Sequence, residues 1–274
     1  MFEVRDLWPE SIAALDMMRK GLIYRCLEAL ELRFYRSASA IIILSEGFRR
    51  SLTGRGISSK KIFAVPNGVD LAEFVPRPAD PQLKSRLGLE GKFVIGFIGT
   101  IGLAHGLEFI LDCAARLLGE NVHFLFIGSG AKKAELASRV DREQLRNVTF
   151  HHIIPHADVP RYMALCDAAL VNLKASETFL SVIPSKIFEA AALERPILLG
   201  VDGIARSIVE GYRAGLFYAP ENAMAFISAV RRLRDDVGLY TELQSGCRGL
   251  ARAYDRNALA ARALEVIKGC VEPR

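Results

Sequence analysis

One stretch decides the fold class of this 274-residue chain: Phe93-Val94-Ile95-Gly96-Phe97-Ile98-Gly99-Thr100-Ile101-Gly102-Leu103-Ala104-His105-Gly106. Its first six residues form a short, mostly apolar run, which is typical of a strand buried on both faces, and a glycine-rich turn follows. The apolar residues after the turn recur at helical spacing: Leu107, Ile110, Leu111, Ala114, Leu117 and Leu118. A strand, a turn and a helix in this order predict a βαβ unit on a parallel sheet.

The same alternation continues towards the C-terminus. Short apolar runs at residues 122–127, 148–151, 168–173 and 196–199 are separated by helical patterns, and Gly128-Ser129-Gly130 closes the first of them. We therefore expect a complete doubly wound α/β, Rossmann-like domain in this part of the chain.

The N-terminal part follows the pattern but is short. A helix is predicted at 22–35 and strands at 40–44 and 61–65, and the segment 74–81 carries three prolines, which suits a linker. The predicted boundaries are 1–78 for a partial N-terminal unit with its linker and 79–274 for the C-terminal domain. The first unit resembles the second half of a similar domain, because no strand followed by a glycine turn opens it.

Composition and charge exclude several classes of protein. The sequence has no apolar run of the roughly 18 residues that span a bilayer and no basic segment before an apolar one at its start. Its five cysteines are scattered without a C-x-x-C pair, which argues against a disulfide framework and a zinc site. These features predict a cytoplasmic protein.

Basic residues are concentrated near the N-terminus. The net charge of +5 is too small to indicate nucleic acid, but residues 17–61 hold ten basic and three acidic side chains. This excess could face an anionic membrane surface or a phosphate-bearing substrate. A solvated helix face beside loops explains it equally well.

The glycine turn is the first candidate for a binding site. A turn between a strand and a helix directs free N–H groups at one point, which suits a phosphate, and Gly99, Thr100, Gly102 and His105 belong to it. The spacing is neither G-x-G-x-x-G nor that of a P-loop. Packing of the helix against the strand is the alternative role for the glycines.

The second candidate is Ile183-Pro184-Ser185-Lys186-Ile187-Phe188-Glu189. Pro184 suits the first position of a helix, which places Lys186 in the first turn and Glu189 on the same face. An ammonium group there attracts a diphosphate, and the carboxylate can accept hydrogen bonds from two sugar hydroxyls. An ordinary exposed Lys–Glu pair is the simpler alternative.

The remaining candidates are weaker. Asp6, beside Trp8 and Pro9, caps a turn or contacts a ligand, and Asn67-Gly68 marks a turn. The five histidines lack a zinc-protease spacing, and His151 and His152 would point to opposite faces if both lay on a strand. No metal and no cofactor is expected.

These motifs together resemble the family 4-type retaining glycosyltransferases of the GT-B fold, over essentially the whole chain. Pro66-Asn67-Gly68-Val69-Asp70 is similar to the family's interdomain junction, residues 97–107 to its phosphate loop, and Pro184 to Ala192 with Arg195-Pro196-Ile197 to its nucleotide-sugar helix. Residues 211–220 resemble its late loop. Arg5-Asp6-Leu7-Trp8-Pro9-Glu10-Ser11 resembles the branch that builds bacterial surface polysaccharides, notably the transferases of N-acetylfucosamine-type sugars.

The resemblance implies a function. A nucleotide sugar, UDP-linked by analogy, would bind the C-terminal domain, with Ile153 beside the base and Lys186 on the diphosphate. Asp6 or Glu10 would touch a sugar. The acceptor would be an oligosaccharide or a lipid diphosphate at the inner face of the cytoplasmic membrane, and the anomeric configuration would be retained.

The sequence also departs from the family. The family carries two glutamates eight positions apart; Glu189 matches the second, but Ser181 stands at the first. His105 stands in the loop where basic residues commonly hold the diphosphate. The first half of the acceptor-side domain is missing, which predicts an N-terminally truncated product or one half of a split enzyme.

Two competing interpretations remain. The chain could bind a nucleotide sugar without catalysis, as a subunit that needs a partner chain. It could also be a nicotinamide-dependent oxidoreductase, although the second strand ends at Phe126-Ile127-Gly128 without the acidic residue that such proteins use.

Overall fold

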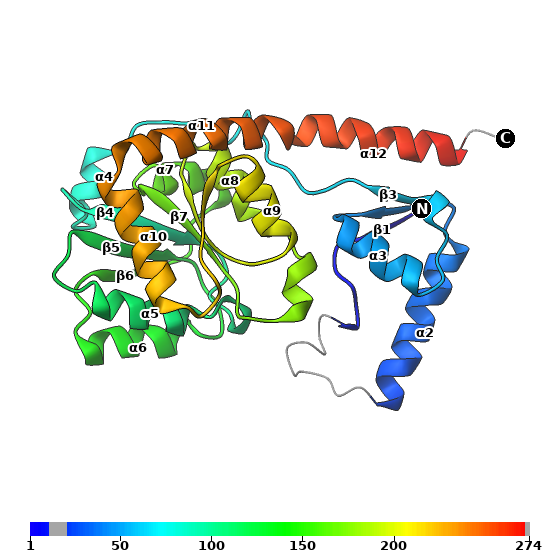
Figure 1. Ribbon diagram of the computed structural model, residues 1–274, viewed down its shortest axis with the longest axis horizontal. Helices are drawn as coiled ribbons and strands as arrows, with labels where there is room; N and C mark the ends of the chain where they lie inside the picture. The colour runs from blue at the N-terminus through cyan, green and yellow to red at the C-terminus, as the bar shows by residue number, and fades with distance from the viewer. Residues whose placement is uncertain (11–20, 272–274) are drawn as a thin grey trace.

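The computed structural model describes residues 1–10 and 21–271 and has two units joined by an extended segment (Figure 1). Ser11, Arg19 and Lys20, which belong to the motif and the basic region noted above, lie outside the described residues. The larger unit is the C-terminal domain, and the smaller one holds the N-terminus.

The C-terminal domain is built on a six-stranded parallel sheet. Its strands are β4 (Phe93–Ile98), β5 (Val122–Ile127), β6 (Val148–His151), β7 (Ala168–Asn172), β8 (Ile197–Gly200) and β9 (Gly215–Phe217). Their order across the sheet is β6-β5-β4-β7-β8-β9, and every pair is parallel. The chain runs outward from β4 in both directions, so the predicted doubly wound topology is confirmed.

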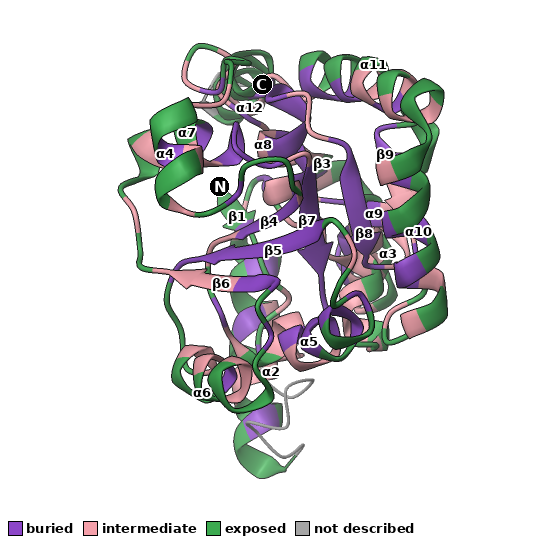
Figure 2. Cartoon of the chain, turned by 90° about the vertical axis from the view of Figure 1, so that its left-hand side faces the viewer, coloured by how far each residue is buried: buried purple, intermediate pink, exposed green. Residues whose placement is uncertain are grey.

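Helices cover both faces of this sheet, as Figures 1 and 2 show. The helices of the domain are α4 (Pro81–Arg86), α5 (Leu107–Arg116), α6 (Lys133–Glu143), α7 (Val159–Met163), α8 (Lys186–Ala192), α9 (Ile204–Gly211), α10 (Ala223–Asp235) and α11 (Val237–Ala253). Neighbouring residues of one strand enter opposite cores: Val94 packs with α7, α8 and α11, and Ile95 with α5 and α10. Burial on both faces explains the nearly continuous apolar runs in the sequence.

The N-terminal unit has a smaller sheet of the same kind. Its elements are β1 (Phe2–Val4), α2 (Leu22–Ser37), β2 (Ile41–Ile43), α3 (Glu46–Gly54) and β3 (Ile62–Ala64). The three strands are parallel in the order β1-β2-β3, and each has three residues. One apolar cluster, centred on Ile41 and Ile43, forms its core.

Charged side chains stabilise the N-terminal unit. The Lys61 ammonium donates to the carbonyls of Tyr35, Arg36 and Ala38. These carbonyls lie at the C-terminal end of α2, where the helix supplies no N–H partner for them. Arg55 donates to the buried carboxylate of Glu31 at 2.6 Å. Arg55 and Lys61, which belong to the basic region, therefore stabilise α2 and are not available to bind an external surface.

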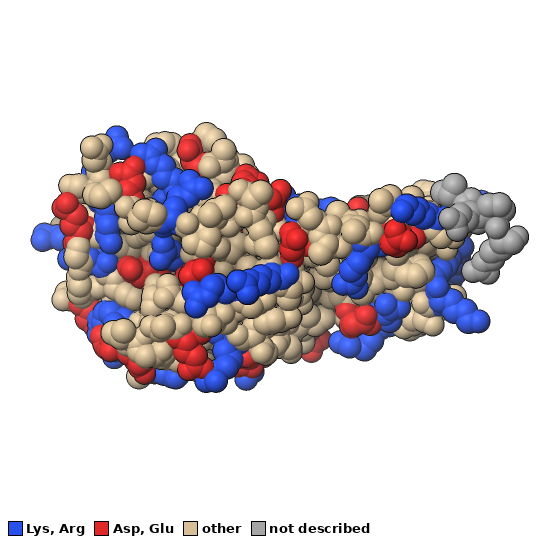
Figure 3. Space-filling view, turned by 90° about the horizontal axis from the view of Figure 1, so that it is seen from above, with Lys and Arg blue, Asp and Glu red and all other residues tan. Residues whose placement is uncertain are grey.

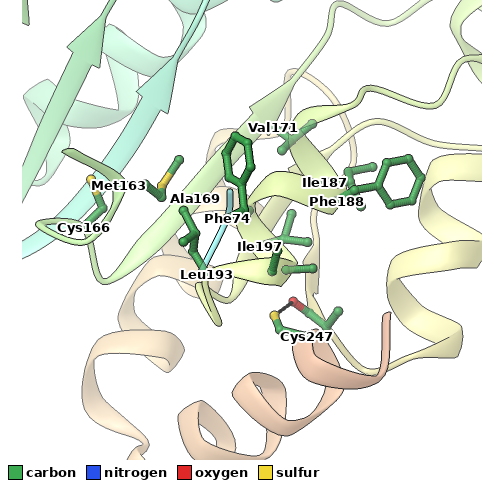
Figure 4. Packing of buried hydrophobic residues seen from close by; sticks show 14 of the residues in the cluster. Phe74, Met163, Cys166, Ala169, Val171, Ile187, Phe188, Leu193, Ile197 and Cys247 are labelled. Carbon is green, nitrogen blue, oxygen red and sulfur yellow. Dashed lines mark hydrogen bonds between the residues drawn. The ribbon is translucent and has the colours of Figure 1, made fainter. Parts of the chain in front are cut away.

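The two units meet through the linker and the last helix. Val69 forms a parallel bridge with Asp255, and Phe74 of the linker is buried among side chains of the C-terminal domain (Figure 4). Helix α12 (Arg256–Val271) continues from α11 over the N-terminal unit, where Arg262 donates to the carbonyl of Ala64 (Figure 1). The last helix therefore contacts the N-terminal unit, although it follows the C-terminal domain in the sequence.

Some local predictions were wrong. Gly215–Phe217, within the expected late loop, forms the edge strand β9; three residues are too few to show a strand pattern. Leu118 lies beyond the end of α5 and is 49% exposed. His152 lies outside β6, so the expectation for two histidines on one strand does not apply, and the centroids of the two rings lie 3.8 Å apart.

Candidate functional site

The glycine turn lies where the strand order of the large sheet reverses. The neighbours of β4 are β5 on one side and β7 on the other, so the loops that follow β4 and β7 diverge at this point. Parallel α/β sheets bind ligands in the crevice that such a reversal opens beyond the carboxyl ends of the strands. A cavity of about 200 Å³ occupies it, lined by Phe97, His105, Val171, Asn172, Leu173, Pro184, Ser185 and Lys186.

Lys186 joins the two sequence motifs at this cavity. It is the first residue of α8, and a Cβ atom added to Gly99 would stand 2.7 Å from its Cε and 2.9 Å from its Nζ. Gly99 also has a φ of 137°, which other residues rarely adopt. The absence of a side chain at position 99 therefore gives the ammonium its place. Pro184 precedes the N-cap residue Ser185 and is not the first helical residue, which corrects the sequence prediction.

The Lys186 ammonium is partly buried and has no anionic partner. Its Nζ lies 3.8 Å from the centroid of the Phe97 ring, a cation–π contact, and it makes no ion pair or hydrogen bond with any described residue. Burial lowers its pKa to about 8, although the carboxylate of Glu189 acts in the opposite direction. Because a desolvated charge without a partner is unfavourable, this arrangement favours an anionic ligand.

His105 lines the same cavity. Its ring meets Phe97 edge-on at 5.4 Å between centroids, and its Nδ1 is buried without a partner. Burial and then the Lys186 ammonium lower the pKa of His105 to about 4, with a smaller opposing contribution from the Gly102 backbone. His105 is therefore neutral at physiological pH in the free chain.

A buried polar pair holds the backbone of His105 in place. Asn172, at the end of β7, donates from Nδ2 to the His105 carbonyl at 2.7 Å. The hydroxyl of Tyr218 donates to the other end of the same amide, at 2.7 Å from Oδ1. Neither residue could be identified from the sequence, since an isolated Asn and an isolated Tyr belong to no motif.

The backbone of the turn is only partly free for a ligand. The N–H groups of Gly99 and Ile101 donate to the carbonyls of Ile127 and Ser129, in the loop after β5. The N–H groups of Thr100 and Gly102 have no acceptor within the described part of the chain. Of the predicted glycine-turn amides, those of Thr100 and Gly102 are therefore free to donate, but neither residue belongs to the lining of the cavity.

Glu189 faces a second pocket of about 550 Å³, between the two units. Its walls come from the start of β1, from the junction after β3 and from α12. The lining side chains and glycine are Met1, Glu3, Arg5, Ile42, Val65, Pro66, Asn67, Gly68, Ser185, Glu189, Arg256, Leu259, Ala260, Ala263 and Ile267. Ser185 lines both pockets, so both border the start of α8.

The Glu189 carboxylate also lacks a hydrogen-bond donor among the described side chains. Burial raises its pKa, while the charges of His156, Lys186 and Arg256 oppose the shift. His156 itself contacts Glu73 of the linker at 2.8 Å. Glu189 is thus a free acceptor at the edge of a pocket between the units.

The other predicted residues lie further away. Ile153 follows β6 at the same edge of the sheet as the turn and is 66% exposed, but it lines neither pocket. Asp6 is exposed and does not line the Glu189 pocket, whereas Glu3 and Arg5 do. Ser181 contacts the N-terminal unit, because its carbonyl accepts a hydrogen bond from Ser45.

Arg256 stands in no motif, and it reaches the Glu189 pocket only because α12 returns to the N-terminal unit. Asn67 was predicted as part of a turn and of the interdomain junction, and it lines this pocket. Within the described ranges, no group of three or more His, Cys, Asp or Glu side chains is arranged to hold a metal ion. None of the described helices has both the length and the apolar character needed to cross a membrane.

Relatives of known class match most of this chain. A probable glycosyltransferase of Pseudomonas aeruginosa, WbjE, is 26% identical over 98% of this chain and 67% of its own length. The putative teichuronic acid biosynthesis glycosyltransferase TuaH of Bacillus subtilis is 25% identical over 94% of this chain and 64% of its own length. The chain therefore spans about two thirds of the length of these relatives.

Solved structures share the fold. HepE of Anabaena, crystallised with UDP-glucose, superposes with a TM-score of 0.81 at 18% identity, over 97% of this chain and 71% of HepE. WaaG, a glycosyltransferase involved in lipopolysaccharide biosynthesis, gives 0.75 at 18% identity, over 97% of this chain and 74% of WaaG. The α/β architecture with parallel sheets is thus that of GT-B glycosyltransferases.

The family model for "Glycosyl transferases group 1" matches residues 92–236, which include the glycine turn, Lys186 and Glu189. Since this match covers more than half of the 274 residues, the chain belongs to the group 1 glycosyl transferases.

Proposed function

We propose that this chain is the donor-binding part of a glycosyltransferase that moves a sugar from a UDP-sugar to a polysaccharide or lipid-linked acceptor, with retention, in cell-surface polysaccharide biosynthesis. One observation carries the proposal: the unpaired Lys186 ammonium lies against Gly99, in a cavity at the reversal of strand order with no acidic residue in its lining. Such a cavity suits the diphosphate of a sugar nucleotide.

Each group then has a role. Lys186 and the N–H groups of Thr100 and Gly102 stabilise the negative charge that develops on the leaving diphosphate. The Glu189 carboxylate accepts hydrogen bonds from the ribose hydroxyls, and the exposed Ile153 lies beside the base. The acceptor enters the pocket between the units and attacks the sugar on the face that the diphosphate leaves.

The uridine base and the biological role rest on the relatives. HepE was crystallised with UDP and with UDP-glucose. TuaH is named for teichuronic acid and WcaI of Escherichia coli for colanic acid biosynthesis. A hexose or N-acetylhexosamine donor, including an N-acetylfucosamine-type sugar, fits this group of relatives.

We propose that the chain acts at a membrane surface. The exposed Arg25, Arg33, Arg36, Arg50 and Lys60 remain available to anionic headgroups after the structural ion pairs are discounted. Figure 3 draws the side of α11 and α12, where acidic side chains are interspersed among the basic ones and no continuous basic surface forms. Contact of the exposed basic residues with the inner membrane face should decrease as salt rises.

Ligand-detected NMR with UDP, GDP, ADP and NAD tests the donor site. We expect UDP to bind and the signal to disappear in both Lys186→Ala and Glu189→Ala, whereas the exposed Lys60→Ala binds as the wild type does. A folded chain that binds none of the nucleotides contradicts the proposal. Binding of NAD alone would indicate the oxidoreductase function instead.

A second candidate is a donor-binding subunit that needs another polypeptide for transfer. It is favoured by the edge strand β1, which pairs only with β2 among the described strands, and by exposed apolar side chains on α2: Leu22, Ile23, Leu30 and Phe34. Binding of UDP without turnover of UDP-sugars on any acceptor would support this candidate.

A further inference from the structure

Two basic side chains, Lys186 and His105, line the cavity at the glycine turn, and in the free chain only Lys186 is charged at neutral pH. The Lys186 ammonium lies over the face of Phe97, and the His105 ring meets the same Phe97 edge-on. Within the described part of the chain, no acidic residue lines the cavity and the buried Nδ1 of His105 has no hydrogen-bond partner. A second cation beside Lys186 is unfavourable in the free chain, because like charges repel strongly where water is excluded.

A diphosphate in this cavity reverses that balance. It brings more than one negative charge within reach of both side chains, and an adjacent anion favours the protonated form of an imidazole. Asn172 holds the backbone carbonyl of His105, which keeps this residue beside the cavity.

We propose that His105 takes up one proton from solvent when the diphosphate of the donor binds, so that two cations, the imidazolium and the Lys186 ammonium, hold the ligand, and that it releases this proton when the nucleoside diphosphate leaves. The step forms and breaks only an imidazole N–H bond. It rests on the proposed function, since it needs a diphosphate in this cavity. It makes His105 a residue that couples donor affinity to pH.

The charged groups around His105 are consistent with this role. Lys186 of α8 is the charged side chain that acts on it, and Lys174, after β7, reaches the neighbouring Gly106 with its side chain. Glu108 of α5, three residues further along, is paired with Lys132 at 3.3 Å. Burial and Lys186 hold the pKa of His105 at about 4 in the free chain, so there is room for a large rise on binding.

Calorimetry of UDP binding at pH 6.5, in two buffers of different ionisation enthalpy, measures the protons taken up. We expect the wild type to take up about one proton more per UDP than His105→Gln, because this variant keeps a polar side chain that cannot titrate. The difference between the two proteins cancels the titration of UDP itself. Lys186 contributes little, since a group with a pKa of about 8 is almost fully protonated at this pH.

NMR of the His105 imidazole nitrogens in the wild type provides a second readout that needs no variant. We expect the signals of a neutral ring at pH 6.5 without ligand and of an imidazolium with saturating UDP. If UDP binds but the ring stays neutral and the two proteins take up equal numbers of protons, the inference is wrong and the donor site stands. If UDP does not bind to the folded chain, the proposed function fails together with it.

Discussion

Each of the two units of this chain contains a buried or partly buried charged side chain, which is paired with a counter-ion in the N-terminal unit and unpaired in the C-terminal domain. In the N-terminal unit the carboxylate of Glu31, 7% exposed, accepts hydrogen bonds from Arg55 and from the hydroxyl of Tyr35. In the C-terminal domain the Lys186 ammonium lies over an aromatic ring and forms no ion pair with any residue that the structure describes. A paired buried charge fixes local structure, whereas an unpaired one is a cost that a ligand can remove.

The size of the apolar core around each charge explains why the charge is paired in one unit and unpaired in the other. Among the residues that the structure describes, the N-terminal sheet has three strands of three residues and one apolar cluster, so a polar network adds to its stability. The C-terminal sheet is buried on both faces by two clusters. A core of that extent can tolerate the cost of one unpaired ammonium at the mouth of a site.

Removing the partner of Glu31 should have the largest effect. We expect Arg55→Met to destabilise the N-terminal unit by about 3–4 kcal/mol, because a buried carboxylate is left without its counter-ion. Hydrogen exchange should accelerate in β2 and β3 and remain unchanged in β4 and β5. The exposed Arg50→Met is the matched control, and equal exchange in the two variants would show that the pair is not structural.

Removing the Lys186 ammonium should stabilise the folded chain, in contrast to the loss of Arg55. The folded chain lowers its pKa to about 8, so the unfolded chain binds the proton more tightly and unfolding takes up protons between about pH 8 and 10.5. Lys186→Met should therefore be more stable than the wild type at pH 7, by about 3 kcal/mol, and the difference should narrow as pH rises through 8–9.5. Urea unfolding at each pH measures it. A wild type that is the more stable protein at pH 7 would contradict an unpaired charge.

The contact between Gly99 and Lys186 can be tested through binding. Gly99→Ala places a methyl group where the ammonium lies and should weaken UDP binding at least tenfold, or about 1.4 kcal/mol. Gly91→Ala is the control, because its φ of 64° is also positive but a methyl group there would meet no atom within 4 Å. A similar loss of affinity in both variants would assign the effect to backbone strain alone.

The hydrogen bond behind His105 should have the smallest effect. Tyr218→Phe leaves the buried Oδ1 of Asn172 without its donor, which should cost about 1–2 kcal/mol of stability. Tyr212→Phe, at a 39% exposed side chain, should change stability by less than about 0.5 kcal/mol. Thermal unfolding of the two variants compares them, and no difference would remove the proposed support of the turn.

Local patterns in the sequence predicted much of this architecture. The apolar runs, the glycine turn and the Pro184–Glu189 motif were recognised because strand burial, turn chemistry and helical spacing act over a few residues. The edge strand β9 was missed because three residues carry no periodicity.

Contacts between distant residues could not be predicted. Lys186 reaches Gly99 only because β7 pairs with β4, and Arg256 reaches the Glu189 pocket only because α12 crosses back to the first unit. Spacing along the chain contains no information on such crossings. For the same reason, the placement of Asp6 outside the pocket that Glu3 and Arg5 line was not foreseen.

We propose that the glycine turn and the start of α8 form one diphosphate site. Hydrogen exchange measured with and without UDP tests this proposal, since both segments contain amides beside the cavity. We predict that UDP protects residues 99–106 and 184–189 together, and that residues 118–123, at the opposite end of the sheet, exchange as before. Protection of only one of the two segments, or of neither while UDP is bound, would contradict the claim.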